Sequence, residues 1–239
     1  MNGLDFRNQR TARKPLRAPW QCARMVVLLG PPGAGKGTQA QRIAAQYGLQ
    51  HLSTGDMLRD NIQRDTDLAR RAKLLINRGD LVSDEIVLGM VQDRIAQTDC
   101  ENGFVLDGFP RTLPQALGLE GICRLYKSKS ITVLNMVIEP ERLIRRLANR
   151  RICQTSGHIY SLVDRPPIRP GFCDIDGSEL VQRPDDTESV IRERIRTYER
   201  NIHPVIDYYS SRGLLYEVEG IGDPDAVMAN ITKVLDGGN

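Results

Sequence analysis

The stretch GPPGAGKGTQ, residues 30–39, contains four glycines, two prolines and a single basic side chain, that of Lys36. The apolar run MVVLL precedes it, and apolar residues at helical spacing follow it in residues 38–47. A buried strand, a glycine-rich turn and a helix in this order are typical of a phosphate-binding loop, whose backbone N–H groups and helix N-terminus surround a phosphate. Lys36 would neutralise the outer phosphates of a nucleotide. A plain glycine turn would require neither this lysine nor its spacing from Gly30.

Strands and helices alternate along the rest of the chain. Short apolar runs predict further strands within residues 48–54, 103–109, 130–139 and 214–220. Apolar residues at helical spacing predict helices at residues 84–97, 140–150 and 187–209. This alternation indicates an α/β fold with a parallel sheet covered by helices on both faces, and ligands bind at the carboxyl ends of its strands. Gly30, Asp107 and Glu139 stand at those ends.

Two segments interrupt the alternation. Residues 54–84 are charged and helical in pattern, with no strand of their own, so they predict an inserted helical lobe whose first helix is capped by Thr54 or Asp56. Residues 151–184 are rich in turn residues and their few apolar side chains alternate, which predicts a small β-rich flap between two helices.

The charge of the chain lies mostly at one end. Its formal net charge is +3, but residues 1–24 hold six basic residues and one acidic residue, which leaves 27 basic and 29 acidic residues in the rest. A nucleic-acid-binding protein would carry its basic excess on the folded body, so we expect no nucleic-acid partner. We expect no membrane association either, because the apolar runs are too short to cross a bilayer.

The cysteines and the first 24 residues bear on the compartment. Five cysteines spread over 239 residues do not indicate a disulfide scaffold, so we expect a reducing environment. Residues 1–24 are interpreted first as a dispensable or spurious extension ahead of a start at Met25. An organelle transit peptide and an ordinary disordered tail are the alternatives. We therefore expect a cytoplasmic protein, or a protein of an organelle matrix if residues 1–24 are a transit peptide.

Four motifs carry a family resemblance. They are GPPGAGKGTQA at 30–40, STGDMLR at 53–59, LDGFPRT at 106–112 with Gln115 just beyond, and RPDD at 183–186. The general phosphate loop has Ser or Thr directly after its lysine, whereas this chain has Gly37 and then Thr38. In order and spacing, and with this variant loop, the chain resembles the adenylate kinases, specifically the bacterial type with a long lid.

The resemblance implies a P-loop NTPase-like fold, a parallel five-stranded sheet flanked by helices, with an inserted helical AMP-binding lobe and an inserted β-rich lid. After the extension at 1–24, it places the core in residues 25–53, 85–150 and 185–239, the AMP-binding lobe in 54–84 and the lid in 151–184. It implies a monomeric kinase that binds ATP, AMP and ADP, uses Mg²⁺ with ATP, and transfers the terminal phosphoryl group of ATP to AMP in adenine nucleotide homeostasis.

The resemblance also assigns site residues. Those for ATP are Gly33, Ala34, Gly35, Lys36, Gly37, Thr38, Arg146, Arg150, Tyr160 and Gly222. Those for AMP are Thr54, Arg59, Asp80, Leu81, Val82, Gly108, Phe109, Pro110, Arg111, Gln115, Arg183 and Arg194. The catalytic residues are Lys36, Arg111, Arg150, Arg183 and Arg194.

Simple chemistry agrees with these roles. Gln115 would read the adenine edge, because an amide both donates and accepts hydrogen bonds. Arg146 and Arg150 are four residues apart and would share one face of a helix. The AMP phosphate is already an anionic nucleophile, so no general base is needed, and Asp107 would orient the Mg²⁺ through water.

The flap raises the question of a second metal. Cys153-x₂-Ser156 and Cys173-x₂-Asp176 keep the spacing of a structural zinc site found in some lids of the family, with Ser156 where a second cysteine is expected. Three ligands leave tetrahedral zinc one short, and His158 stands two residues away from the expected position. The sequence therefore favours a lid held by polar side chains over zinc held by Cys153, Cys173 and Asp176.

Three rival functions remain. A UMP/CMP kinase shares the loop and the DGFPR-like segment, but Gln115 and the long flap disfavour it. A GTP-using kinase is harder to exclude, because residues 220–222 read Gly-Ile-Gly where relatives often have a lysine near the donor base. A nucleotide-binding module without catalysis would have no need for the arginine cluster.

Overall fold

The computed structural model describes residues 24–63, 75, 78, 80–126, 131–220 and 222–237. The predictions on residues 1–23, and those on most of residues 64–79 in the expected helical lobe, lie outside the described residues.

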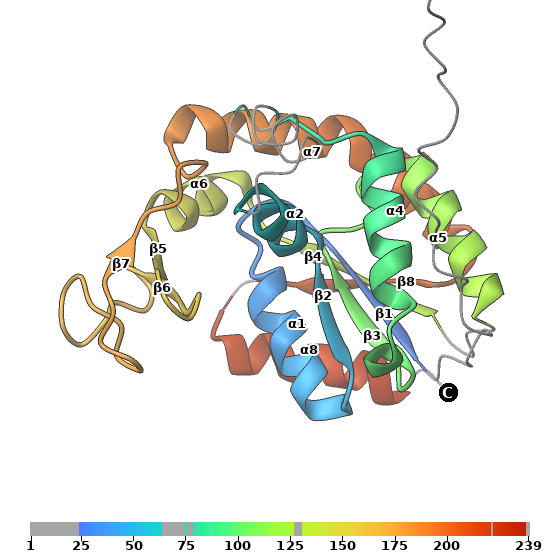
Figure 1. The fold of residues 1–239 in the computed structure, drawn as a ribbon, viewed down its shortest axis with the longest axis horizontal. Coiled ribbons are helices and arrows are strands. Elements are labelled where there is room, and N and C mark those ends of the chain that lie inside the picture. The colour runs from blue at the N-terminus through green and yellow to red at the C-terminus, as the bar shows by residue number, and fades with distance from the viewer. Residues whose placement is uncertain are drawn as a thin grey trace, which may run out of the picture.

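A five-stranded parallel sheet forms the centre of the molecule (Figure 1). Its strands are β1 (Met25–Leu29), β2 (Gln50–Ser53), β3 (Phe104–Asp107), β4 (Ile131–Val137) and β8 (Leu215–Glu219), in the order β2-β3-β1-β4-β8. The predicted parallel sheet is confirmed. β1 lies between β3 and β4, and all five of its residues are buried. The loop that follows β1 therefore leaves the sheet at the centre of its carboxyl edge, the position where α/β sheets bind ligands.

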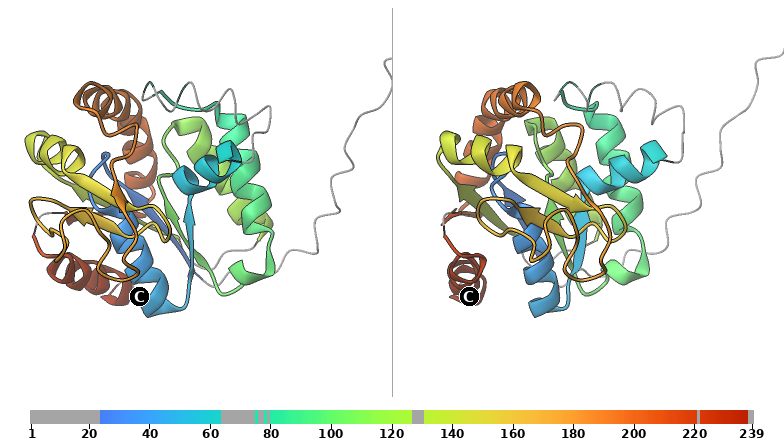
Figure 2. Two further views of the ribbon diagram at one scale, coloured as in Figure 1. Left: turned by 60° about the vertical axis from the view of Figure 1, so that its left-hand side comes forward. Right: turned by 90° about the vertical axis from the view of Figure 1, so that its left-hand side faces the viewer.

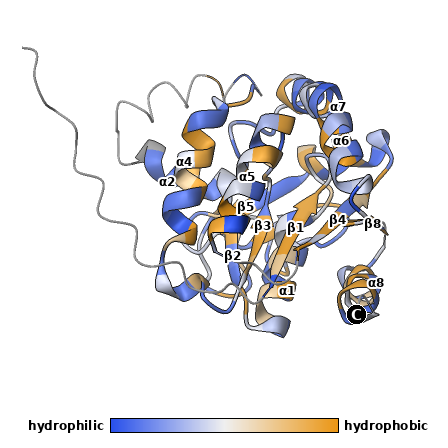
Figure 3. Cartoon of the chain, turned by 90° about the vertical axis from the view of Figure 1, so that its right-hand side faces the viewer, coloured by the Kyte–Doolittle hydropathy of each residue, from blue (hydrophilic) through white to orange (hydrophobic). Residues whose placement is uncertain are grey.

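Alternate residues of β1 contact different layers of helices, as the period of two in a strand requires. Val26 and Leu28 belong to the core under α1 (Lys36–Tyr47) and α8 (Pro224–Gly237). The other residues of β1 pack under α4 (Asp84–Ile95), α5 (Leu113–Leu125) and α7 (Glu188–Ser210). Figure 2 shows the helices on both faces of the sheet, and Figure 3 shows hydrophobic strands between them. A short 3₁₀ helix, η1 (Thr98–Cys100), precedes β3.

The predicted β-rich flap is present between α6 (Pro140–Ala148) and α7. It contains β5 (Arg150–Cys153), β6 (Ile159–Ser161) and β7 (Leu180–Val181), which form an antiparallel sheet in the order β6-β5-β7. The expectation that Arg146 and Arg150 share a helix face is wrong. α6 ends at Ala148 with Asn149 as its C-cap, and Arg150 begins β5, because the chain turns there into the flap.

The predicted cap of the first lobe helix is also wrong. α2 runs from Thr54 to Gln63, and the side chain that caps it is that of Ser53, whose Oγ accepts from the backbone N–H of Asp56 at 3.2 Å. Thr54 is already helical, and its hydroxyl instead donates to the carbonyl oxygen of Gly108 at 2.9 Å. This bond ties the start of α2 to the loop after β3.

Two glycines of α5 test how α4 packs on α5. A Cβ on Gly118 would lie 2.4 Å from Cδ2 of Leu88 on α4, whereas a Cβ on Gly121 would have nothing within 4 Å. We expect Gly118→Ala to lower the free energy of unfolding by about 1 kcal/mol, because Leu88 must move. Gly121→Ala should raise it by about 0.5 to 1 kcal/mol through helix propensity. Urea unfolding measures both, and changes of the same sign would contradict this packing.

Candidate active site

The loop between β1 and α1 presents main-chain amides rather than side chains. Gly33 and Gly35 have φ angles of 85° and 87°, in the left-handed region that favours glycine. α1 begins directly after Gly35, and among the described residues no side chain caps its first turn. The first N–H groups of the helix, at the positive end of its dipole, are therefore available to an anion.

Lys36 folds back onto this loop. Its Nζ donates to the carbonyl oxygens of Gly30 at 2.7 Å and Pro31 at 2.8 Å. Burial lowers the pKa of Lys36 to about 8, although the charge of Asp107 opposes this shift, and the charges of nearby arginines lower the pKa further. A phosphate bound at the loop would favour the charged ammonium group.

Asp107 ends β3, and its carboxylate lies beside Gly37. A Cβ at position 37 would come within 3.3 Å of Oδ2 of Asp107, which is tighter than most Cβ contacts. This proximity accounts for glycine where the general loop has Ser or Thr. Within the part of the chain that the structure describes, no group donates a hydrogen bond to the Asp107 carboxylate, although its side chain is only 14% exposed. A mostly buried carboxylate with no protein donor suits a metal-bound water.

The segment after β3 carries the second group of predicted residues. Gly108 accepts at its carbonyl oxygen from Nε of Arg111 at 2.7 Å as well as from Thr54. Arg111 is thereby held against the end of the sheet on the side of α2. Leu81 and Pro110 line the same space, Val82 and Phe109 are buried in the core beneath it, and Asp80 is exposed.

Gln115 is buried, and two hydrogen bonds fix the orientation of its amide. Oε1 accepts from the backbone N–H of Arg111 at 2.8 Å, and Nε2 donates to Oδ1 of Asp84 at 2.8 Å. An amide offers two N–H donors and two acceptor lone pairs, so one of each remains for a ligand. This pair suits a base edge that has a donor beside an acceptor.

The predicted cations lie close enough to one another to shift their pKa values. Burial, and then the charge of Arg194, lowers the pKa of Arg111 to about 10. Burial, and then the charges of Arg59 and Arg150, lowers the pKa of Arg183 to about 10. Residues predicted from four separate motifs are therefore brought together. Arg59 itself is ion-paired with Asp56 on α2.

Two carboxylates for which no role was predicted hold Arg150 and Arg194 in place. The fully buried carboxylate of Asp186 accepts from Nε and Nη2 of Arg150 at 2.7 and 2.6 Å. Asp185 accepts from Nη1 of Arg194 at 2.8 Å, and Asp186 lies 3.4 Å from the same nitrogen. The signal was present in the RPDD motif, of which only Arg183 was assigned.

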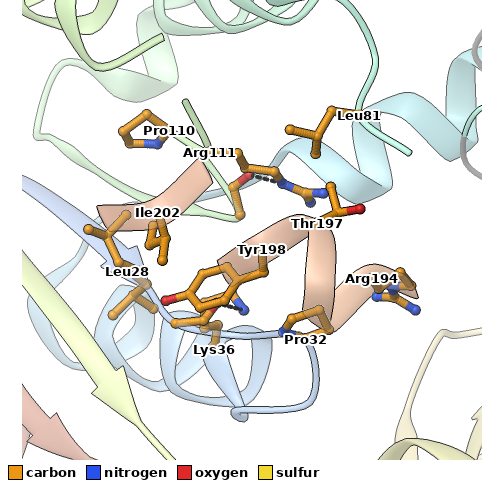
Figure 4. Close-up of a pocket in the computed structure, with 13 residues that line it drawn as sticks. Leu28, Pro32, Lys36, Leu81, Pro110, Arg111, Arg194, Thr197, Tyr198 and Ile202 are labelled. Atoms are coloured by element: carbon orange, nitrogen blue, oxygen red, sulfur yellow. Dashed lines mark hydrogen bonds between the residues drawn. The ribbon is translucent and has the colours of Figure 1, made fainter. Parts of the chain in front are cut away.

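A cavity connects the loop with the segment after β3. Its lining includes three of the cations, Lys36, Arg111 and Arg194, together with apolar side chains of which Leu28 and Ile202 are examples. Figure 4 shows Lys36 and Arg111 on opposite walls. Cations on facing walls of an apolar chamber can hold two phosphate groups end to end, and the apolar walls strengthen each charge interaction by excluding water.

Tyr198 also lines this cavity, one helical turn after Arg194 on α7 (Figure 4). Burial raises the pKa of its hydroxyl. No motif in the sequence pointed to this residue, and only its spacing from Arg194 could have suggested that the two side chains share a helix face.

Of the ten residues predicted for ATP, all of which the structure describes, Lys36 alone lines this cavity. Three of the others lie in the flap or near the end of β8. Arg146 donates from Nη1 to the carbonyl oxygen of Gly220 at 3.3 Å, at the carboxyl edge of β8, and Gly222 follows in the same loop. Tyr160 is buried inside the flap, where its hydroxyl accepts from the backbone N–H of Asp174 at 2.8 Å. Their roles in ATP binding stay predictions.

The flap gathers four groups of metal-binding type. Sγ of Cys153, a ring nitrogen of His158, Sγ of Cys173 and a carboxylate oxygen of Asp176 all lie within 4.8 Å of one another. The doubt about the position of His158 was therefore wrong, because the turn after Cys153 brings its ring back to Cys173 at 3.4 Å. Ser156 donates to Asp176, as expected for a lid held by polar side chains.

Hydrogen bonds in the flap favour anionic ligand groups. The hydroxyl of Ser156, and then the backbone N–H of Ser178, lowers the pKa of Asp176. Burial raises the pKa of the Cys173 thiol, but hydrogen bonds from Tyr160 and from backbone amides outweigh it, so the net shift is downward.

Comparison with known proteins agrees with this site. The family model of the adenylate kinases matches residues 28–214. The chain is 46% identical to an adenylate kinase of Archaeoglobus fulgidus over 211 residues, which cover 88% of this chain and 97% of the relative. It is 45% identical to that of Bacillus subtilis over 212 residues, 89% of this chain and 98% of the relative. The chain, with its phosphate loop and facing arginines, belongs to the adenylate kinase family.

Proposed function

We propose that five cations perform the reaction of this family in this chain, the reversible transfer of the terminal phosphoryl group from ATP to AMP, which gives two ADP. They are Lys36, Arg111, Arg150, Arg183 and Arg194. The observation that carries the proposal is the cavity itself, because Lys36 on the ATP side and Arg111 on the AMP side line one chamber.

The two nucleotides bind on either side of this chamber. The ATP phosphates lie on the amides of Gly33 to Thr38, and the rest of ATP extends toward Arg146, Tyr160 and Gly222. The AMP phosphate contacts Arg59 and Arg111. AMP is further surrounded by Thr54, residues 80–82, residues 108–110, Gln115, Arg183 and Arg194.

The reaction relies on position and charge. The AMP phosphate is an anionic nucleophile, so no side chain has to remove a proton, and the arginines hold its oxygens in line with the terminal phosphoryl group of ATP. Charge spreads over the oxygens of the transferring group, and Lys36 with the arginines stabilises it. Mg²⁺ bound with ATP would supply further charge neutralisation, and Asp107 would orient it through a water.

The inserted segments exclude water from the chamber. The core comprises residues 25–53, 85–150 and 185–239, the AMP-binding lobe residues 54–84, and the lid residues 151–184. The lobe and the lid close over the nucleotides, because water in the chamber would hydrolyse ATP. The protein acts as a monomer in the cytoplasm, without a nucleic-acid partner. Among the described residues, no helix has the length and hydrophobicity needed to span a membrane.

The acceptor preference tests the function and the role of Gln115. In a coupled assay with ATP and Mg²⁺, we expect ADP from AMP at least about tenfold faster than from CMP, UMP or GMP. Gln115→Ala should raise the KM for AMP by about tenfold or more and leave the KM for ATP within about twofold, because of the two nucleotides only AMP loses hydrogen bonds to its base.

The matched control is Gln41→Ala, on the exposed face of α1, which should leave both KM values unchanged. No ADP from ATP and AMP would contradict the function. Equal losses for both nucleotides in Gln115→Ala would contradict only the placement of AMP.

For the flap we propose that the cluster of Cys153, His158, Cys173 and Asp176 holds a structural zinc ion. Two separations support it: Cys173 Sγ to His158 Nδ1 is 3.4 Å, and His158 Nδ1 to Asp176 Oδ2 is 3.8 Å. Cys153 Sγ to Asp176 Oδ2, at 3.2 Å, is slightly shorter than the range for zinc ligands. Tetrahedral zinc with bonds of about 2.0 to 2.3 Å has ligand atoms about 3.3 to 3.8 Å apart.

Metal analysis of the protein, stripped with chelator and reloaded, tests this site. We expect about one equivalent of zinc in the parent protein and less than about 0.2 in His158→Ala, because three ligands hold zinc poorly. His203→Ala, an exposed histidine on α7, should keep its zinc. Zinc below about 0.2 equivalents in the parent protein would leave the lid held by hydrogen bonds alone.

A further inference from the structure

We propose that His51 is a positioning residue for Asp107, which it holds in the orientation needed toward metal-bound ATP. The inference rests on the proposed function, in which Asp107 orients Mg²⁺ through a water. His51 belongs to none of the four motifs and has no role in the site described so far.

The pairing of β2 with β3 places His51 and Asp107 on one face of the sheet. Ser53 pairs with Asp107 and His51 pairs with Val105 in a parallel register. Paired residues of neighbouring parallel strands point to the same face, and so do residues two apart on one strand. Val105 belongs to the core under α1. His51 and Asp107 therefore both point toward α1, the helix that begins at the phosphate loop.

The two side chains face each other, but the hydrogen bond between them is not formed. Nε2 of His51 lies 3.7 Å from Oδ2 of Asp107, and the two side chains are only 20% and 14% exposed. Nε2 is buried and has no hydrogen-bond partner among the described residues. A buried polar atom without a partner is costly, so the arrangement favours a bond to the Asp107 carboxylate.

A small displacement completes this bond. With its proton on Nε2, His51 donates to Oδ2 once the two atoms approach by about 0.8 Å, to the usual distance of about 2.9 Å. Gly37 borders the same oxygen, since a Cβ there would lie 3.3 Å away. A donor at Oδ2 prevents rotation of the carboxylate and keeps its other oxygen in a constant direction, as partners of metal-binding groups commonly do.

A merely structural role for His51 makes a different prediction. A ring that only fills space between β2 and α1 would affect the stability of the protein but not its preference for metal-bound ATP. The discriminating quantity is the ratio of two dissociation constants for the β,γ-imido analogue of ATP, measured without and with Mg²⁺ by titration calorimetry. This ratio needs no turnover.

Two substitutions at position 51 separate these roles. We expect His51→Leu, which removes the donor, to lower the Mg²⁺ preference by about tenfold, the lower end of the effect typical of such partners. His51→Gln, whose amide can donate, should keep the preference within about threefold of the parent protein. The control Gln50→Leu, one residue away on β2 and directed to the opposite face, should change neither the preference nor ADP formation.

Asp107→Asn makes failure of the inference distinguishable from failure of the function. Loss of the Mg²⁺ preference in Asp107→Asn and His51→Leu, with rescue in His51→Gln, supports the proposal. If only Asp107→Asn loses the Mg²⁺ preference, His51 does not position Asp107, and the proposed function still stands. The same conclusion follows if both His51 variants unfold at a lower temperature but keep the Mg²⁺ preference. Absence of ADP formation by the parent protein overturns the proposed function itself.

Discussion

The structure depends on keeping several positive charges buried close together. Lys36, Arg111 and Arg194 line one cavity, and each has its pKa lowered, with burial as the largest cause. Charges removed from water are costly unless carbonyl dipoles, carboxylates or bound anions compensate them. In this protein different groups compensate different charges. Lys36 donates to two loop carbonyls, Arg150 pairs with Asp186, and Arg194 pairs with Asp185. Nucleotide phosphates would supply the remaining negative charge.

This constraint explains the positions of several residues that carry no charge. Gly33 and Gly35 allow the backbone to turn its amides inward, and Gly37 leaves room for the Asp107 carboxylate. β1 is buried on both faces, so the loop that follows it starts from a fully buried strand at the centre of the sheet. Rigid donors stabilise a developing charge without having to reorganise during the reaction. The core therefore matters for catalysis as well as for stability.

Much of the fold was predictable, because local signals and the global fold agree in the core. The apolar run at 25–29 and the glycine loop predicted β1, the loop and α1, and the alternation of strands and helices predicted the parallel sheet. Element ends were less predictable. Ser53 caps α2, because the hydroxyl of Thr54 donates to the carbonyl oxygen of Gly108 instead. α6 stops before Arg150, because the chain turns there into the flap. Both outcomes depend on tertiary contacts that lie outside the local sequence.

The candidate site was most predictable where a motif carried it. The loop, Arg59, Arg111 and Arg183 stood in four recognisable motifs, whereas Arg150 and Arg194 lie outside them and came from the family resemblance alone. The role of Asp186 was not predicted, because it holds Arg150, which is 36 positions away in the sequence. By spacing, His158 stands two residues from the position expected of a zinc ligand, yet the turn after Cys153 brings its ring to Cys173. His51 carries no signal in the sequence, since only strand register places it beside Asp107.

Proton uptake on ATP binding tests most directly whether the buried cations require phosphate. With its pKa lowered to about 8, Lys36 is about half protonated at pH 8 before ATP binds, and phosphates should raise its pKa again. Titration calorimetry at pH 8, where the phosphates of ATP are already fully ionised, should therefore show uptake of about half a proton in buffers of different ionisation enthalpy, and no such uptake in Lys36→Met. Release of protons, or the same uptake in Lys36→Met, would contradict the account.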